Sequence, residues 1–187
     1  PPRRPADLNE SGLDTVYNLS GLERRFEASH EELGLLDDEL APALMGERLN
    51  ELALDHLGGD PAEHGIMVFN RQTAAVMTAT GVLAGPGDTV VGVSATGSHP
   101  CVIRGAKVAG ANFIDTLGLA PFEKALGENA NVALVSMTRL AVSYEILSVK
   151  EIEKIVKLAH GAGARVLVDD AGGARVGPAV FEQPKML

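Results

Sequence analysis

The chain has 187 residues, of which 45% are hydrophobic and 4% are aromatic, with no Trp. This length and this apolar content suffice for one ordinary globular domain and exclude a disordered chain. The formal net charge of −9 argues against a general binder of the nucleic-acid backbone. The single cysteine, Cys101, excludes an internal disulfide and a metal site built from several cysteines.

The sequence shows no targeting or membrane signal. No apolar run approaches membrane-spanning length, and the N-terminal residues lack the apolar centre of a signal peptide. Together with the single cysteine, these features predict a cytoplasmic protein. The chain begins at Pro1 instead of Met and stops at Leu187 without a structural end signal, so we interpret it as a piece of a longer protein.

The first 60 residues differ from the rest. Residues 1 to about 16 are rich in Pro, Arg, Asp and Asn and are typical of a loose arm. Apolar positions between residues 33 and 57 predict helices that are broken around Pro42 and Gly46. We therefore expect an N-terminal arm with helices over residues 1–60 and an α/β domain over residues 61–187.

From residue 66 onward, short apolar runs alternate with helical patterns. This pattern predicts strands at 66–69, 89–94, 112–115, 132–136 and 166–168, and helices at 72–84, 100–109 and 121–126. A further helix follows Ser148, which forms a capping-box signature with Glu151. Continuous apolar strands alternating with helices predict an α/β fold with a mostly parallel central sheet and helices on both faces.

Two adjacent acids, Asp169 and Asp170, end the last apolar run, and ligands of parallel sheets bind beyond the carboxyl ends of strands. Adjacent acids can also hold Mg²⁺, but that site needs further carboxylates, and Asp115 is the only candidate. Neighbouring side chains of a strand point to opposite sides, which disfavours a two-acid metal clamp, and we predict no metal site. A carboxylate that caps a turn stays an open alternative.

Two other strand ends carry polar residues. Arg71, Gln72 and Thr73 stand where a strand becomes a helix, and free amides at a helix start can bind a phosphate. The alternative is an ordinary helix start with an exposed arginine. His99 follows the strand at 89–94, where an imidazole can stack on a flat ring or move protons; otherwise it is a capping or surface histidine.

Other patterns in the sequence are weaker indications of function. Gly92 to Gly97 is close to a nucleophile elbow, but its second glycine is one residue late. The sequence contains neither a Gly-x-Gly-x-x-Gly motif nor a Walker loop, which removes the usual dinucleotide and nucleoside-triphosphate signatures. His30, His56 and His64 do not have the spacing of metal ligands.

Taken in order, the three strand ends resemble the large domain of the fold-type-I pyridoxal-phosphate enzymes. Within these, the chain from about Asn18 onward is most similar to the selenocysteine-synthase group, which contains bacterial L-seryl-tRNA(Sec) selenium transferase and its archaeal relatives. The resemblance implies pyridoxal 5'-phosphate as cofactor. It also implies a transferase or lyase that acts on an amino acid or aminoacyl substrate, with β-replacement as the most specific form.

The resemblance also implies roles for single residues. Arg71, Gln72 and Thr73 match the family positions that bind the phosphate, and His99 matches the one that stacks on the ring face. Asp169 matches the acid at the ring nitrogen, and Ala171 matches the small residue beside it. Ser136 and Thr138 match positions near the ring and its 3-oxygen. His99 and Asp169 are the catalytic candidates. The segment 18–22 resembles one that reaches the active site, which usually lies at a dimer interface, so a homodimer or higher homo-oligomer is implied. A tRNA partner has no support from the charge.

The chain departs from the family at one essential position. Family members carry a Schiff-base lysine about one helix and one strand after the aspartate, and this chain stops before that point. Lys185 comes too early, in a stretch typical of a surface turn, and is not assigned the role. Either the lysine belongs to a C-terminal part outside this chain, or the chain is a catalytically inactive scaffold or regulatory subunit that retains the fold.

Overall fold

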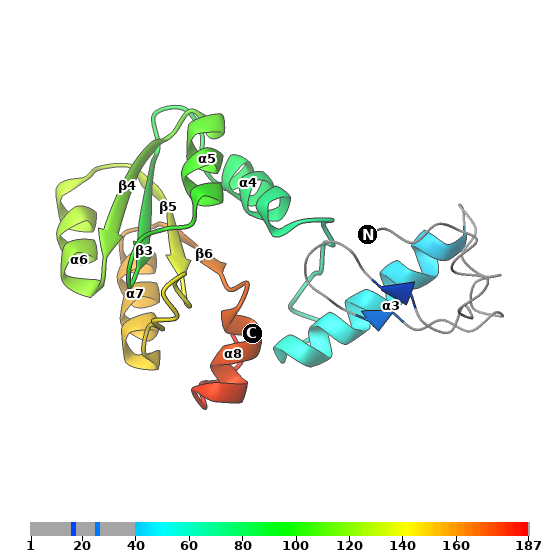
Figure 1. The fold of residues 1–187 in the computed structure, drawn as a ribbon. Coiled ribbons are helices and arrows are strands. Elements are labelled where there is room, and N and C mark those ends of the chain that lie inside the picture. The colour runs from blue at the N-terminus through cyan, green and yellow to red at the C-terminus, as the bar shows by residue number, and fades with distance from the viewer. Residues whose placement is uncertain (1–15, 18–24, 27–39, 187) are drawn as a thin grey trace. The chain divides into compact units, whose positions relative to one another are not determined.

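Four parallel strands form the central sheet of the chain in this computed structural model, which describes residues 16–17, 25–26 and 40–186. They are β3 (Thr89–Ser94), β4 (Asn112–Leu117), β5 (Val132–Thr138) and β6 (Arg165–Asp169), in the order β4-β3-β5-β6 (Figure 1). The register pairs Gly92 with Ser136 and Thr138 with Asp169. The carboxyl ends of β5 and β6 therefore lie side by side.

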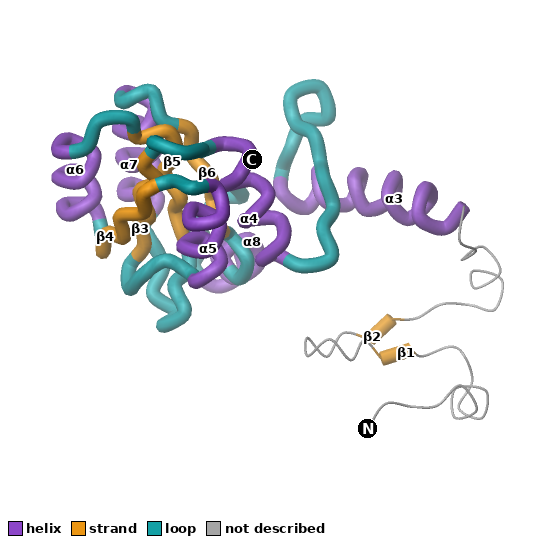
Figure 2. The backbone as a smooth tube through the Cα atoms, turned by 90° about the horizontal axis from the view of Figure 1, so that it is seen from above, coloured by secondary structure: helices purple, strands orange, loops and turns teal. Residues whose placement is uncertain are grey.

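Helices cover both faces of this sheet, as Figure 2 shows from above. One face carries α4 (Gln72–Leu83) and α5 (Pro100–Ala109), and the other carries α6 (Leu119–Glu128) and α7 (Val149–Gly161). Strand side chains alternate between the two layers: Val135 and Met137 pack with the α6 and α7 residues, and Leu134 packs with those of α4 and α5. The predicted α/β fold with helices on both faces is confirmed.

The helix starts follow from local chemistry. The Ser148 hydroxyl accepts a hydrogen bond from the Glu151 N–H, and the Glu151 carboxylate accepts one from the Ser148 N–H at 2.8 Å. This is the predicted capping box. The Ser148 hydroxyl also donates to the Glu151 carboxylate at 2.7 Å, and this bond together with the one from the Ser148 N–H holds the pKa of Glu151 below its usual value. Helix α5 begins at Pro100 after His99 and ends at Gly110, whose φ of 74° lies in the left-handed region that glycine favours.

The chain divides into two units, Pro1–Ala53 and Leu54–Leu187. In the first, β1 (Val16–Tyr17) pairs antiparallel with β2 (Arg25–Phe26). The predicted segment 18–22 lies outside the described residues. Across the described ranges, no helix is long and apolar enough to cross a membrane.

Helix α3 (Leu40–Leu57) runs without interruption through Pro42 and Gly46, so the expected break there is wrong. A proline is tolerated in the first turn of a helix, where its missing N–H would have no partner. A glycine inside a helix costs only about 1 kcal/mol, which does not stop it.

The strand expected at 66–69 is also absent. The segment is not part of a sheet, and its side chains Met67 and Val68 are 76% and 55% exposed. A strand needs a hydrogen-bonded neighbour. The edge strand β6 pairs only with β5 among the described residues, and residues 66–69 form no hydrogen-bonded ladder with its free edge.

Candidate functional site

A cavity of about 310 Å³ lies where the carboxyl ends of β5 and β6 meet the first residues of α4 and α5. Ligand sites of this fold class occur at this edge of the sheet. The predicted site residues that line the cavity are Gln72, His99, Thr138, Asp169 and Ala171. The structure thus brings five of the eight predicted residues to one cavity.

Asp169 is the most buried acid of the site, with 4% of its surface exposed. Its carboxylate accepts hydrogen bonds from the Gln72 side-chain amide and from the backbone N–H of Ala171. No ion pair found in the described part of the chain includes it. Burial therefore raises the pKa of Asp169 above its usual value, and nearby His99 opposes this rise only in part.

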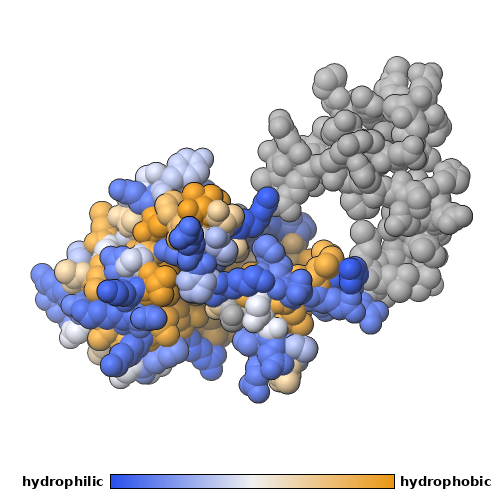
Figure 3. Space-filling model, turned by 90° about the horizontal axis from the view of Figure 1, so that it is seen from below, coloured by the Kyte–Doolittle hydropathy of each residue, from blue (hydrophilic) through white to orange (hydrophobic). Residues whose placement is uncertain are grey.

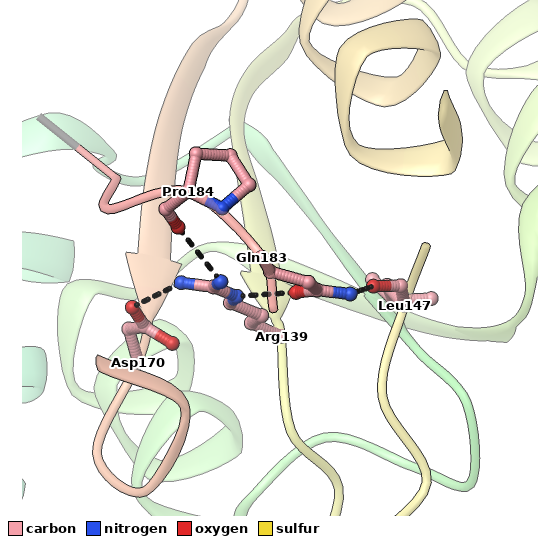
Figure 4. A network of polar contacts seen from close by, with 5 residues as sticks. All are labelled: Arg139, Leu147, Asp170, Gln183 and Pro184. Carbon is pink, nitrogen blue, oxygen red and sulfur yellow. Dashed lines mark hydrogen bonds and ion pairs between the residues drawn. The ribbon is translucent and has the colours of Figure 1, made fainter. Parts of the chain in front are cut away.

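Asp170 points away from Asp169, as the alternation of strand side chains predicts. Its carboxylate pairs with the guanidinium of Arg139 at 3.3 Å, and Arg139 is 1% exposed (Figure 4). Arg139 also donates to the Gln183 side chain and the Pro184 carbonyl, each at 2.9 Å. This network fixes the segment that follows Asp169.

The third carboxylate that a Mg²⁺ site would need is occupied elsewhere. Asp115 lies on β4 and accepts a hydrogen bond from the Ser98 hydroxyl at 2.7 Å. The two adjacent acids at 169 and 170 also have separate partners. The geometry therefore gives no support to a Mg²⁺ clamp of these acids.

His99 stands directly before α5, with its imidazole exposed toward the cavity. Its Nδ1 accepts from the Cys101 N–H at 3.3 Å and lies 2.9 Å from the Cys101 Sγ. Cys101 is buried beneath it, and burial together with the Asp169 carboxylate raises the pKa of the thiol. His99 thus caps a helix, as its plainer interpretation holds, and also borders the cavity.

The start of α4 supplies Gln72 to the cavity, but Arg71 and Thr73 do not line it. Arg71 is exposed and makes no capping hydrogen bond. Gln72, expected in the phosphate-binding turn, instead hydrogen-bonds to Asp169. The first amides of α4 are not satisfied inside the helix, which leaves them available to an anion.

Two buried hydroxyls on β5 have no hydrogen-bond partner. Thr138 Oγ1 lies at the cavity, while Ser136 Oγ is fully buried one pleat earlier in the strand. Buried polar atoms are paired in most proteins, and an unpaired one beside a cavity can hydrogen-bond to a group bound there. Thr138 therefore has an open position for a bound group.

Several features of this region were not found from the sequence. Arg139 pairs with Asp170, Cys101 contacts His99, and Tyr144 lines the cavity from the loop after β5. The sequence signal that could have identified Arg139 is its position directly after Thr138, at a strand end. The loop residue Tyr144 and the pairing of Cys101 with His99 carry no sequence pattern.

Lys185 is exposed and donates to the backbone carbonyl of Asp55 at 2.8 Å. It does not line the cavity, and neither does any other lysine of the described residues. The Ser94 hydroxyl is buried and accepts from the Gly97 N–H at 2.7 Å. Ser94 is therefore a turn residue and not an exposed nucleophile.

A second, larger cleft of about 600 Å³ adjoins the first along the outer side of β6. Apolar side chains dominate its lining, among them Met67, Phe69, Val76 and Leu167. Figure 3, which looks from below at the edge toward which the strands of Figure 1 point, shows apolar residues scattered among hydrophilic ones. Val166, Leu167 and Val168 of β6 are half-buried and line this cleft.

Comparison with known proteins gives relatives of one kind. No family model matches the chain. It is 31% identical over 178 residues to a UPF0425 pyridoxal phosphate-dependent protein of Methanosphaera stadtmanae, a match that covers 95% of this chain and 44% of the relative. A protein of the same name from Methanothermobacter thermautotrophicus is 32% identical over 177 residues, with 94% and 45% covered. The chain spans less than half the length of these relatives.

Solved structures share the fold. Serine palmitoyltransferase from S. paucimobilis superposes with a TM-score of 0.55 at 23% identity, over 66% of this chain and 31% of that one. N-Succinyldiaminopimelate aminotransferase from Mycobacterium tuberculosis gives a TM-score of 0.56 at 17% identity, over 66% and 34%. These likenesses identify the fold as part of the large domain of the fold-type-I enzymes.

Proposed function

We propose that this chain is part of a pyridoxal-phosphate-dependent protein of the UPF0425 family and that the cavity beside Asp169 receives the pyridine ring. The observation that carries this proposal is a buried carboxylate at a strand end with no cationic partner among the described residues. The printed names of the relatives and the shared fold support it.

The residues at the cavity fit the cofactor. A protonated pyridine nitrogen would supply the positive charge that Asp169 lacks. Thr138 Oγ1 is unpartnered and can hydrogen-bond a ring oxygen, and the exposed His99 imidazole borders the same cavity and can stack on a ring face. A cavity of about 310 Å³ is in the range of small-molecule sites.

When bound, pyridoxal phosphate withdraws electrons from a carbanion at the α-carbon of an amino acid. The chain's own residues would bind and orient this cofactor. Asp169 holds a proton on the ring nitrogen by charge pairing, and Gln72 holds the Asp169 carboxylate in place. The N-terminus of α4, with Arg71 and Thr73, offers amides, a guanidinium and a hydroxyl to the phosphate.

Substrate and assembly belong to the same proposal. We infer an amino acid or aminoacyl substrate and, in the most specific form, a β-replacement like that of L-seryl-tRNA(Sec) selenium transferase. The Schiff-base lysine would come from polypeptide outside this chain, and a second subunit would complete the site. Ser136 lies beneath Thr138 on β5 and would support the ring from below.

Pyridoxamine 5'-phosphate tests the proposal because it binds without a Schiff-base lysine. Titration calorimetry should show one molecule bound per chain. Asp169→Asn should weaken binding at least about tenfold, since an opposite charge shifts a pKa by about 1–3 units. Asp55→Asn, at an exposed acid on α3, is the matched control and should bind like the wild type. Absence of binding, or equal binding by Asp169→Asn, would contradict the proposal and favour the scaffold alternative.

A further inference from the structure

Three side chains of different chemistry converge where α5 begins and β6 ends. They are the His99 imidazole, the Cys101 thiol and the Asp169 carboxylate, and one ligating atom from each lies within 4.8 Å of the other two. Cys101 and Asp169 are 1% and 4% exposed, while His99 reaches solvent. The group is therefore held by the fold on its inner side and is accessible from outside.

The sulfur and the nitrogen are already in contact. His99 Nδ1 lies 2.9 Å from Cys101 Sγ and accepts a hydrogen bond from the Cys101 N–H at 3.3 Å, so Nδ1 is an unprotonated ring nitrogen, and a metal ion bound there would replace this hydrogen bond. A metal ion needs an unprotonated imidazole nitrogen. Because His99 and Cys101 are two residues apart around a helix start, the backbone fixes their approach.

The third ligand is an anion without a counter-charge. The Asp169 carboxylate receives hydrogen bonds from an amide side chain and a backbone N–H, both neutral donors. A thiolate and a carboxylate together would carry two negative charges, which one divalent cation neutralises. One sulfur, one nitrogen and one oxygen are a donor set that suits Zn²⁺ and does not suit Mg²⁺ or Ca²⁺.

We propose that His99, Cys101 and Asp169 form a binding site for one zinc-class divalent cation, with water as the fourth ligand. On binding, the Cys101 S–H bond breaks, a metal–sulfur bond forms and the proton passes to solvent, so no electron is transferred. His99 and Asp169 also belong to the proposed ring site. If that function holds, the cation and the cofactor exclude each other.

Cobalt(II) is the probe for the site itself. Tag-free chain titrated with Co²⁺ should develop a near-ultraviolet sulfur-to-cobalt charge-transfer band that saturates at one ion per chain and disappears on addition of Zn²⁺. Cys101 is the only cysteine of the chain, so this band identifies the ligand without any mutation. Absence of the band in the wild-type chain would overturn the proposal.

Variants then test the other two ligands. His99→Ala and Asp169→Asn should each weaken Zn²⁺ binding at least about tenfold, the loss that even an outer-shell partner can cause. His160→Ala, at an exposed histidine of α7, should leave Zn²⁺ binding unchanged. Equal Zn²⁺ affinity in all three variants would overturn the assignment, and circular dichroism checks that each variant is folded.

Competition separates this inference from the proposed function. Zn²⁺-loaded chain should bind pyridoxamine 5'-phosphate at least about tenfold more weakly than metal-free chain, matching the loss expected for Asp169→Asn. A cobalt band in a chain that never binds pyridoxamine 5'-phosphate would contradict the function and support the metal site. Simultaneous full binding of both would overturn the shared use of His99 and Asp169.

Discussion

The Asp169 carboxylate is buried without an opposite charge, and this arrangement should lower the stability of the chain. Its raised pKa means that, as pH rises past the usual Asp value, the unfolded chain loses the proton before the folded chain does. The folded state then binds more protons than the unfolded state, so the free energy of unfolding falls with rising pH in that window. Below the usual value, both states are protonated and this effect vanishes.

Asp169→Asn should therefore stabilise the free chain at neutral pH while it weakens the cofactor site. The neutral amide keeps an oxygen for the Gln72 donor and removes the buried charge. We expect a gain in the free energy of unfolding of about 1–3 kcal/mol at pH 7. Urea unfolding at several pH values measures it, and the gain should shrink toward about pH 4. A loss of stability at pH 7 would show that the carboxylate is compensated.

For single residues, the sequence predicted which side chains lie near one another but not which of them form hydrogen bonds. Asp169, His99 and Thr138 were expected at one site because each follows or ends a strand of a parallel sheet. The contact of Gln72 with Asp169 was not predictable, since it depends on the angle at which α4 meets β6. Arg139 was missed for a similar reason, because a buried arginine is rare unless paired, and its partners lie far along the chain.

Arg139 links three elements through one side chain. It lies at the end of β5, pairs with Asp170 after β6 and reaches the segment after α8 (Gly173–Val180) at Gln183 and Pro184. A Cβ atom at Gly177 would clash with the Arg139 guanidinium. Glycine at 177 is therefore required for the close approach of α8 to this side chain.

Arg139→Leu should destabilise the chain by about 3–5 kcal/mol, because it leaves Asp170 partly buried without its partner. Lys124→Ala is the control, since Lys124 pairs with Glu128 on the exposed surface of α6 and such pairs contribute about 0–1 kcal/mol. Chemical denaturation of both variants measures the difference. Similar small losses in the two variants would show that the Arg139 network contributes little.

Helices and strands were predicted best where the pattern was local. The helix after Ser148 was found because its capping box and apolar face lie within the same stretch. Helix α8 was not found, because Gly173, Gly177 and Pro178 each disfavour a helix. It forms where two of its glycines accommodate Arg139, which is a tertiary contact that no local pattern reports. The strand expected at 66–69 is absent for a different reason: its apolar pattern is typical of a strand, but the segment does not pair with any described strand.

The unit Leu54–Leu187 as a whole presents an apolar cleft of about 600 Å³ beside its edge strand. Its lining is mostly apolar, and exposed apolar surface can mark an interaction site or an association hazard. An edge strand with free backbone groups adds to the hazard. We therefore expect this cleft to bind apolar probes.

Anilinonaphthalene sulfonate, a dye that fluoresces in apolar surroundings, should bind the native chain at this cleft. Met67→Glu should reduce the fluorescence, because Met67 lines the cleft and is 76% exposed. Val82→Glu places the same charge at a 75% exposed site outside the cleft and should leave the fluorescence unchanged. As surface substitutions, both should alter stability by no more than about 0.5 kcal/mol. Equal dye binding by the two variants would contradict this location.

The order β4-β3-β5-β6 also governs how quickly the chain can fold. Each pairing in this sheet joins strands that are separated by at least one helical crossover. Forming each pair therefore closes a long loop, and the entropy of loop closure is lost before packing contacts can compensate for it. Proteins dominated by such distant pairings fold more slowly than helical bundles of similar stability. Because β6 is synthesised after β5, the growing sheet keeps the β5 edge unpaired until α7 and β6 have left the ribosome, and an unpaired strand edge is prone to aggregation during that interval.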